Sequence, residues 1–453
     1  MEPRFCPGGW RQRQLFRSAR MTSMTAYTHG RLRRTRLRPA VVRYRAARKA
    51  LQTPASAQSR RGLDWMNFFI ADVQTGFGTF VAFYLAQQGW SQDRVGVALA
   101  VGGIAGVLSQ IPGGALADTL AWKRALAALG IVMIGAAALV LALAPSFPAV
   151  LAAEILHGST AGIITPAIGA ISLGLVGRRA MSLRTGRNYR YAAAGHVMTA
   201  ALMGVAGSYF APGAIFVAAG ALCVPALIAL ATIRGEEIDY ARARNAATGE
   251  HAGKVDRVFD LVKNRRLLLF AAAIMLFQLA DASLLPLVGE NLAATTHDHA
   301  ALWMSGLIIT PELIVAVLAP WVGFHSERRG RRPLLLIGFA VEPIRALILA
   351  ATSAYPFLLA AQLLGGVSAS IIGVLTVIVI TDLTAGTGRF NLAQGAVGAL
   401  SGLVAATSNV MAGYLVHTFG PATGFLATAT AGGAATALLW VFLSETKPER
   451  YAD

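Results

Sequence analysis

The stretch GALADTLAWKRAL at residues 114–126 recurs as GFHSERRGRRPLL at residues 323–335, an offset of 209 residues. The same offset carries Asp72 onto Asp281, and an offset of 208 carries Glu154 onto Gln362. A repeat unit of about 200 residues is far longer than the unit of a solenoid or a propeller. The sequence therefore predicts a duplicated domain.

The composition indicates a polytopic membrane protein: 55% of the 453 residues are hydrophobic and 14% are charged. This excludes a soluble enzyme, so neither enzymatic activity nor a cofactor is expected. Each repeat contains six apolar stretches, and each stretch is long enough to cross a bilayer, which takes on the order of 20 residues. These stretches are 63–87, 95–117, 125–144, 148–176, 190–211, 213–233, 267–289, 301–323, 333–352, 356–380, 392–416 and 421–443. We predict an all-α fold with twelve transmembrane helices in two pseudo-symmetric six-helix bundles.

The domain organisation follows from these stretches. The bundles occupy residues 63–233 and 267–443, joined by a cytoplasmic linker at 234–266 and followed by a short tail at 444–453. The second part of the linker is either a solvated connector or a short amphipathic helix lying on the cytoplasmic membrane surface. Such a helix would carry apolar residues at helical spacing, namely Val255, Val258, Phe259 and Val262.

Residues 1–62 form a basic extension with 16 Lys and Arg side chains against the single acid Glu2. We expect it to be a disordered extension, which is compatible with a true start at Met21, Met24 or Met66. The alternatives are contact with anionic lipid or a transit peptide. Because this extension carries most of the net charge of +18, the charge does not indicate nucleic-acid binding. With the N-terminus inside, nearly all Lys and Arg fall on the cytoplasmic side. This predicts a multi-pass protein of the plasma (inner) membrane with both termini cytoplasmic.

The repeated stretch resembles the loop signature of the major facilitator superfamily of secondary transporters, G-x-x-x-D-x-x-G-x-[RK]-[RK]. The first copy has Ala121 in place of the second glycine. The matching residues are Gly114, Asp118, Lys123 and Arg124 in the first copy, and Gly323, Glu327, Gly330, Arg331 and Arg332 in the second. The resemblance implies that these loops hold the two halves together during conformational switching. It would place Asp118 at the start of helix eleven near Arg389, and Glu327 at the start of helix five near Arg187.

Ionisable residues inside a bilayer are costly and indicate function. Asp72, Glu154, Asp281 and Gln362 fall on helices one, four, seven and ten, which line the central cavity by the same resemblance. The repeat relates Asp72 to Asp281, so a pseudo-two-fold axis would place them on opposite walls. Either carboxylate could couple transport to protons, or could simply bond neighbouring helices. His157 lies one turn after Glu154, so the two could share a proton.

Other polar residues in the spans receive weaker assignments. Glu342 and Arg345 are three residues apart, which predicts an ion pair on helix nine, and we interpret it as structural. Glu312, beside Pro311 on helix eight, lines the cavity or a gate, or is structural. His196 is interpreted as a packing residue. The run His297, Asp298 and His299 is weak evidence for a metal site, and we expect no metal.

The sequence contains no phosphate-binding loop, so an ion or solute gradient is the expected energy source. We predict a secondary transporter, a symporter or antiporter, that moves a small organic solute by alternating access and is coupled to protons. The direction stays open. The alternative is a non-transporting sensor or accessory protein of the same fold. The expected partners are the solute, the proton and the lipid bilayer, and the resemblance implies a functional monomer.

Overall fold

The computed structural model describes residues 55–75, 81, 84–85, 88–143, 146–209, 213–247, 261, 263–288 and 300–448. Side chains at 72–75, 92, 203–209 and 300–305 lie outside the described set. The basic extension up to residue 54 and the predicted amphipathic segment around Val255 also lie outside it.

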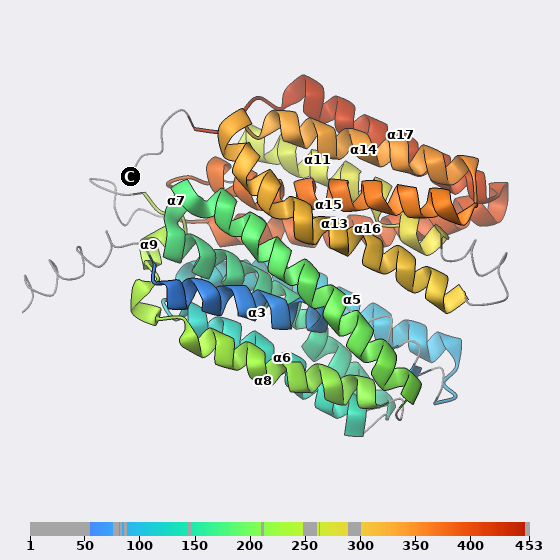
Figure 1. Cartoon of the computed structure of the whole chain (residues 1–453), viewed down its shortest axis with the longest axis horizontal. Helices are drawn as coiled ribbons and strands as arrows, with labels where there is room; N and C mark the ends of the chain where they lie inside the picture. Colours follow the sequence, from blue (N-terminus) through green and yellow to red (C-terminus); the bar gives the residue numbers. More distant parts are fainter. Residues whose placement is uncertain are drawn as a thin grey trace, which may run out of the picture. The chain divides into compact units, whose positions relative to one another are not determined.

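Two groups of helices follow each other along the chain (Figure 1). The first group consists of α3 (Ala57–Thr75), α5 (Gln92–Thr119), α6 (Lys123–Leu143), α7 (Phe147–Tyr209) and α8 (Ala214–Thr232). The second consists of α11 (Arg265–Asp281), α13 (Ala300–Arg329), α14 (Arg332–Ala351), α15 (Tyr355–Leu383), α16 (Phe390–Phe419) and α17 (Pro421–Phe442). The short elements η1 (Gly235–Glu237) and α9 (Tyr240–Ala243) lie between the two groups in sequence.

The element α7 is two transmembrane helices in one. Its 63 residues would measure about 95 Å if straight, roughly three times the thickness of a hydrocarbon core. The chain turns at Gly177, where φ is 69° and ψ is 175°, a left-handed conformation that favours glycine. Helices four and five therefore meet at Gly177, and helix five begins well before the expected residue 190.

Ten described helices are long and apolar enough to cross a membrane. Counting α7 twice and adding α3 gives the predicted twelve. The helix α3 falls short on hydropathy because its first half carries Arg60, Arg61 and Asp64. It begins at Ala57, before the expected start at residue 63. The predicted fold class is confirmed.

Helices two and four pack through small residues. A methyl group on Gly113 would overlap the carbonyl oxygen of Gly162, and one on Gly158 would overlap that of Gly102. Such close backbone contact is typical of helix association in lipid, where no hydrophobic force drives helices together. The abundance of glycine in these spans is thereby explained by packing.

Two pairs of helices join the halves, and the repeat relates them. On one side α5 packs on α16, where Gly114 lies against the backbone of Asn391 and Leu392. On the other side α13 packs on α7, where Gly323 lies against the backbone of Ser182. The first glycine of each signature copy therefore permits one of these two contacts. We call the end of the protein that contains both signature copies the signature-loop end.

The beginning of the linker is folded against both halves. The backbone N–H of Asp239 donates to the carbonyl of Gly174, at the end of helix four. Asn245, whose φ is 61°, donates from Nδ2 to the carbonyl of Thr381 in α15 at 2.7 Å. Its own carbonyl accepts from the N–H of Gly386 at 2.9 Å. This part of the linker therefore fixes the signature-loop ends of helices four and ten.

Candidate functional site

The first signature copy joins the halves through Asp118, near the end of α5. Its Oδ1 accepts hydrogen bonds from the backbone N–H of Asn391 at 3.1 Å and from Asn391 Nδ2 at 2.8 Å, and its Oδ2 accepts one from the N–H of Leu392 at 2.8 Å. These donors lie in the first turn of α16, where unpaired N–H groups favour a carboxylate. Asp118 thus lies at the start of helix eleven, but its partners are Asn391 and Leu392, not Arg389.

The second copy forms a larger network. Glu327 in α13 accepts hydrogen bonds from the hydroxyl of Ser182 in helix five and from Arg331 Nη2, the latter at 2.9 Å. The buried Arg331 guanidinium also donates from Nε to Asp382 in α15 at 3.1 Å. Glu327 therefore meets the start of helix five at Ser182. The partner expected from the resemblance, Arg187, binds elsewhere.

The basic residues of the signatures act inside each half. Arg124 at the start of α6 donates from Nη2 to the carbonyl of Ala231 in α8 at 3.2 Å. Arg332 at the start of α14 donates from Nη2 to the carbonyl of Trp440 in α17 at 2.7 Å. The repeat relates the two bonds, which tie helix three to helix six and helix nine to helix twelve. The side chain of Lys123 is buried and donates to the carbonyl of Ala117.

Two adjoining cavities of about 160 and 130 Å³ lie between the halves. Their walls come from α3, α5 and α7 on one side and from α11, α15 and α16 on the other, and they share Thr165, Tyr189, Val377 and Gln394. Every described side chain that lines them is uncharged. The polar ones are Asn67, Gln110, Thr165, Thr185, Asn188, Tyr189, Thr376, Gln394 and Ser401.

Sequence reasoning missed these lining residues because it searched the spans for ionisable groups. Gln394 is the most informative of them: its buried Oε1 has no hydrogen-bond partner among the described residues. Buried polar atoms are nearly always paired, so this acceptor at the interdomain cavity is open to a hydrogen-bond donor within the cavity. Gln110 is also well placed, since its side chain approaches Gly398 of α16 across the interface.

A charged cluster in the second half brings two of the predicted residues together. Arg345 of α14 donates from Nη1 to Asp281 of α11 at 2.7 Å and to Glu342 at 3.0 Å, and from Nη2 to Gln362 of α15 at 3.2 Å. Arg345, Glu342 and Gln362 are buried, whereas the Asp281 side chain is 38% exposed. The predicted Glu342–Arg345 pair is confirmed. The interpretation of this pair as structural stays a prediction, and the structure adds that Arg345 also contacts Asp281 and Gln362.

The position of the Arg345 guanidinium depends on Gly365 in α15. A Cβ at residue 365 would lie 2.9 Å from Arg345 Cζ and 3.0 Å from its Nε. The sequence could not show this, because a glycine within a span does not reveal which side chain crosses over it. The guanidinium thus occupies the space that a side chain at position 365 would fill.

In the sequence of the first half, the Glu342–Arg345 pair of this cluster has no charged counterpart. At an offset of 209, Met133 and Ala136 take the places of Glu342 and Arg345. Glu154 is buried, its carboxylate contacts Gly102 of α5, and its Oε1 has no hydrogen-bond partner among the described residues. His157, one turn later, is half-buried. Asp72 lies in α3, but its side chain is outside the described set.

Glu312 and His196 form a contact between the halves near the middle of the spans. His196 Nδ1 of helix five lies 3.2 Å from Glu312 Oε2 of α13, and both side chains are partly exposed. The interpretation of His196 as a packing residue is therefore incomplete. On the opposite interface, the position that the repeat assigns to Glu312 is Gly103.

A second buried charged cluster was missed because it lies near a predicted span boundary. Asp64 of α3 accepts from Arg184 Nη2 at 2.5 Å and from Arg187 at 3.0 Å (Nε) and 2.6 Å (Nη2). Arg184 Nε in turn donates at 2.7 Å to Asn188, which lines the smaller cavity. The repeat places Ala273 opposite Asp64, so this cluster is specific to the first half.

The weak metal motif at His297, Asp298 and His299 lies outside the described residues. Within the described part of the chain, no group of three His, Cys, Asp or Glu side chains could hold a metal ion.

Comparisons with known proteins agree with this geometry. A family model described as Major Facilitator Superfamily matches residues 64–340 and 276–453. The chain is 35% identical over 389 residues to an uncharacterized MFS-type transporter, Rv2456c, of Mycobacterium tuberculosis strain H37Rv, covering 85% of this chain and 93% of that protein. The counterpart in strain CDC 1551, MT2531, matches equally.

Two solved structures share the fold at low sequence identity. The proton:xylose symporter XylE aligns with a TM-score of 0.63 and 16% identity, covering 86% of this chain and 96% of that one. The nucleoside transporter NupG aligns with a TM-score of 0.60 and 13% identity, covering 84% of this chain and 99% of that one. At these identities the likeness concerns the fold.

Proposed function

Because the chain belongs to the major facilitator superfamily, we propose that it is a proton-coupled secondary transporter of a small, uncharged, hydrogen-bonding organic solute. The observation that carries the proposal is the pair of interdomain cavities, which both halves line with amides and hydroxyls. Alternating access requires a site that is contacted by both halves, since only then does rocking of one half against the other change its exposure.

The solute class follows from the chemistry of the cavity walls. An ionised solute would need an opposite charge to offset its desolvation, and the described lining offers none. Gln394, Gln110, Asn188 and Tyr189 can each donate or accept a hydrogen bond, which suits hydroxyl, carbonyl or amide groups on a solute. The two solved structures named above are a proton:xylose symporter and a nucleoside transporter, and sugars and nucleosides are solutes of this kind.

The proposed coupling site is the cluster around Arg345. Two carboxylates, Asp281 and Glu342, share this one guanidinium. Glu342 accepts through Oε1, and its Oε2 has no hydrogen-bond partner among the described residues. One negative charge is therefore left uncompensated within the cluster, and a proton would neutralise it. Because Asp281 is the exposed member, it is the group that can exchange a proton with water. Asp72, which the repeat relates to Asp281, stays a candidate for the same role.

Glu312 and His196 are a second candidate for coupling, since they connect helices of opposite halves. A proton on this pair changes the strength of an interdomain contact, and hence the balance between conformations. Glu154 has no basic neighbour in the described contacts, and we assign it and His157 to the packing of helices two and four.

The test is pH-gradient-driven flux in proteoliposomes across a panel of sugars, nucleosides and small organic ions. We expect uphill accumulation of a neutral solute, abolished in Asp281→Asn while solute exchange without a gradient is retained. Glu236→Gln is the matched control, because this exposed acid lies in η1, far along the chain from the cluster. Accumulation by Asp281→Asn at the wild-type level would reject Asp281, and Glu312→Gln would then be tested.

The alternative function is a sensor or accessory protein that binds without transporting. It predicts solute binding to the purified protein with no flux under any imposed gradient. That result in sealed vesicles, with the protein shown to be folded, would overturn the transporter proposal.

A further inference from the structure

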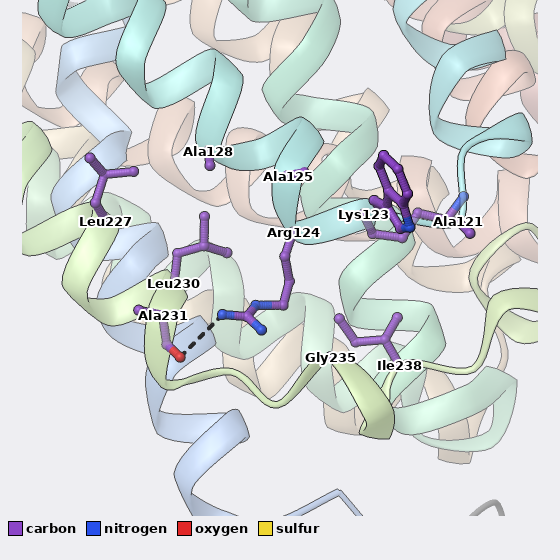
Figure 2. Close-up of a pocket in the computed structure, with 11 residues that line it drawn as sticks. Ala121, Lys123, Arg124, Ala125, Ala128, Leu227, Leu230, Ala231, Gly235 and Ile238 are labelled. Atoms are coloured by element: carbon purple, nitrogen blue, oxygen red, sulfur yellow. Dashed lines mark hydrogen bonds between the residues drawn. The ribbon is translucent and has the colours of Figure 1, made fainter. Parts of the chain in front are cut away.

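A cavity of about 550 Å³ lies apart from the two interdomain cavities, at the signature-loop end of helices three and six (Figure 2). Its walls are the start of α6, the last turn of α8 and the first residues of the linker. Figure 2 shows the side chain of Arg124 extending from α6 toward Ala231, with Leu227 and Leu230 on the facing helix. None of these lining residues also lines the two interdomain cavities, so the proposed solute site does not account for them.

The lining combines two basic residues, Lys123 and Arg124, with apolar side chains. The ammonium group of Lys123 donates to the carbonyl of Ala117, so Arg124 is the cation available to a ligand. Arg124 donates one hydrogen bond, from Nη2 to the carbonyl of Ala231, while its buried Nε has no hydrogen-bond partner among the described residues. None of the described lining residues is acidic. Beside Arg124 the indole of Trp122 is 78% exposed, as is typical of aromatic residues at the level of lipid headgroups. The deeper wall, formed by Ala128, Leu227 and Leu230, is apolar.

The second half shows what occupies the corresponding place. There Glu445 accepts hydrogen bonds from the backbone N–H groups of Arg331 at 2.9 Å and Arg332 at 3.1 Å, at the start of α14. In the first half the repeat relates Glu445 to Glu236, which is exposed, and the next acid, Glu237, accepts from the N–H and hydroxyl of Ser56, both at 3.0 Å. The described contacts therefore include no carboxylate at the start of α6, whereas Glu445 lies at the start of α14.

The surroundings of this cavity favour an anionic ligand that is part of a lipid. Directly next to the lining residues, α6 and α8 expose Leu129, Val132, Val224 and Ile228 on their outer faces. In a bilayer such faces contact acyl chains, so the cavity is continuous with the lipid phase. Basic pockets between transmembrane helices on the cytoplasmic side suit anionic headgroups, and basic residues place this end of the protein on that side.

We propose that this cavity binds one anionic phospholipid, with its phosphate on the Arg124 guanidinium and an acyl chain along Ala128 and Leu227. The phosphate then lies near the start of α6, much as the carboxylate of Glu445 lies at the start of α14, where it accepts from backbone N–H groups. It fills the gap between helices three and six and thereby holds the first signature copy in place.

The experiment is a titration of the purified full-length protein with phosphatidylglycerol, and separately with phosphatidylcholine of the same chains, counting bound lipids by native mass spectrometry. We expect one phosphatidylglycerol to bind selectively. Arg124→Gln should weaken it about five-fold, the value of one basic residue near an anionic surface, and leave phosphatidylcholine unchanged. Ala128→Trp, which keeps the cation and fills the apolar wall, should also lower binding.

Arg332→Gln is the matched control, because Arg332 donates to the carbonyl of Trp440 in the second half as Arg124 donates to that of Ala231 in the first. We expect this variant to leave lipid binding unchanged. A thermal melt of each variant verifies folding. Equal binding of the two lipids, or wild-type phosphatidylglycerol binding by both Arg124→Gln and Ala128→Trp, would overturn the proposal. Displacement of the lipid by millimolar inorganic phosphate would identify a site for free anions and reject the lipid.

Discussion

Asp118 and Asn391 lie 273 residues apart in the chain and are joined by two hydrogen bonds to one carboxylate oxygen. Asn391 also donates to the carbonyl of Ala243 at 3.0 Å, so the linker shares this junction. On the other interface Glu327 meets Ser182. Both signature copies thus bridge the halves at one end of the protein, and the structure is closed there.

Asp118→Asn should favour the conformation that is open at the signature-loop end. The amide cannot accept the three hydrogen bonds that the carboxylate accepts, and hydrogen bonds to a charged group contribute roughly 1.5–3 kcal/mol each. Loss of one such bond shifts the conformational equilibrium by about ten-fold. Distances between spin labels on the ends of α5 and α16 would measure this shift.

The control for that experiment is Asp93→Asn, at the exposed opposite end of the same helix. It should leave the distance distribution unchanged. An unaltered distribution in Asp118→Asn would mean that glycine packing alone holds this end closed.

Gly113→Ala should destabilise the first half. The added methyl would overlap the carbonyl oxygen of Gly162, and both atoms belong to backbones that cannot easily move apart. Overpacking of this kind costs about 1–3 kcal/mol. Gly103→Ala on the same helix is the control, since a methyl there meets open space. Thermal melts in detergent should separate the two variants; equal melting temperatures would contradict the proposed close packing of helices two and four.

The sequence predicted the fold almost completely, because the duplication, the twelve apolar stretches and the two signatures are all linear patterns. It also placed Asp118 and Glu327 at the correct helices. It did not predict their bonding partners, since main-chain donors such as those of Asn391 and Leu392 carry no residue-type signal. The resemblance placed the two acids near Arg389 and Arg187, and Arg187 binds Asp64.

The candidate site was less predictable. A search for ionisable residues finds Asp281 and Arg345, but sequence spacing cannot tell that helices seven and nine bring their side chains within 2.7 Å of each other. Uncharged lining residues such as Gln394 are invisible to that search, because amides are frequent in helix interfaces. Their role depends on a cavity that exists only once both halves are assembled.

Gly365→Ala should disturb proton coupling without changing any charged residue. The new methyl would displace the Arg345 guanidinium, which lies 2.9 Å from the place of this Cβ, and so separate it from Asp281 or Gln362. We expect gradient-driven accumulation to fall by at least ten-fold, while the protein melts within a few degrees of the wild type. Gly433→Ala in α17, where a Cβ meets open space, is the control. Full accumulation by Gly365→Ala would show that the Arg345 contacts are dispensable for coupling.

Glu445→Gln should lower stability near neutral pH and have little effect in acid. Partial burial raises the pKa of Glu445, but backbone N–H groups of Arg331, Lys447, Arg332 and Thr446 outweigh this and hold the pKa below its ordinary value. A carboxyl whose pKa is lower in the folded state stabilises the protein above its unfolded pKa, about 4.3, and this stabilisation is lost as the pH falls through the folded value.

The expected cost of Glu445→Gln at pH 7 is about 1 kcal/mol, comparable to the loss of a helix N-cap, because Glu445 serves the first N–H groups of α14 from outside the helix. Melting curves recorded at neutral pH and at successively lower pH, below the unfolded pKa, should show this difference shrinking as the wild-type carboxyl becomes protonated. Glu236→Gln, at the position that the repeat relates to Glu445, should melt like the wild type at both pH values, since Glu236 is exposed and makes no such contact in the described structure. A pH-independent difference in melting temperature between the wild type and Glu445→Gln would show that the negative charge of Glu445 does not contribute to stability. It would also weaken the comparison with an anion at the start of α6 in the first half.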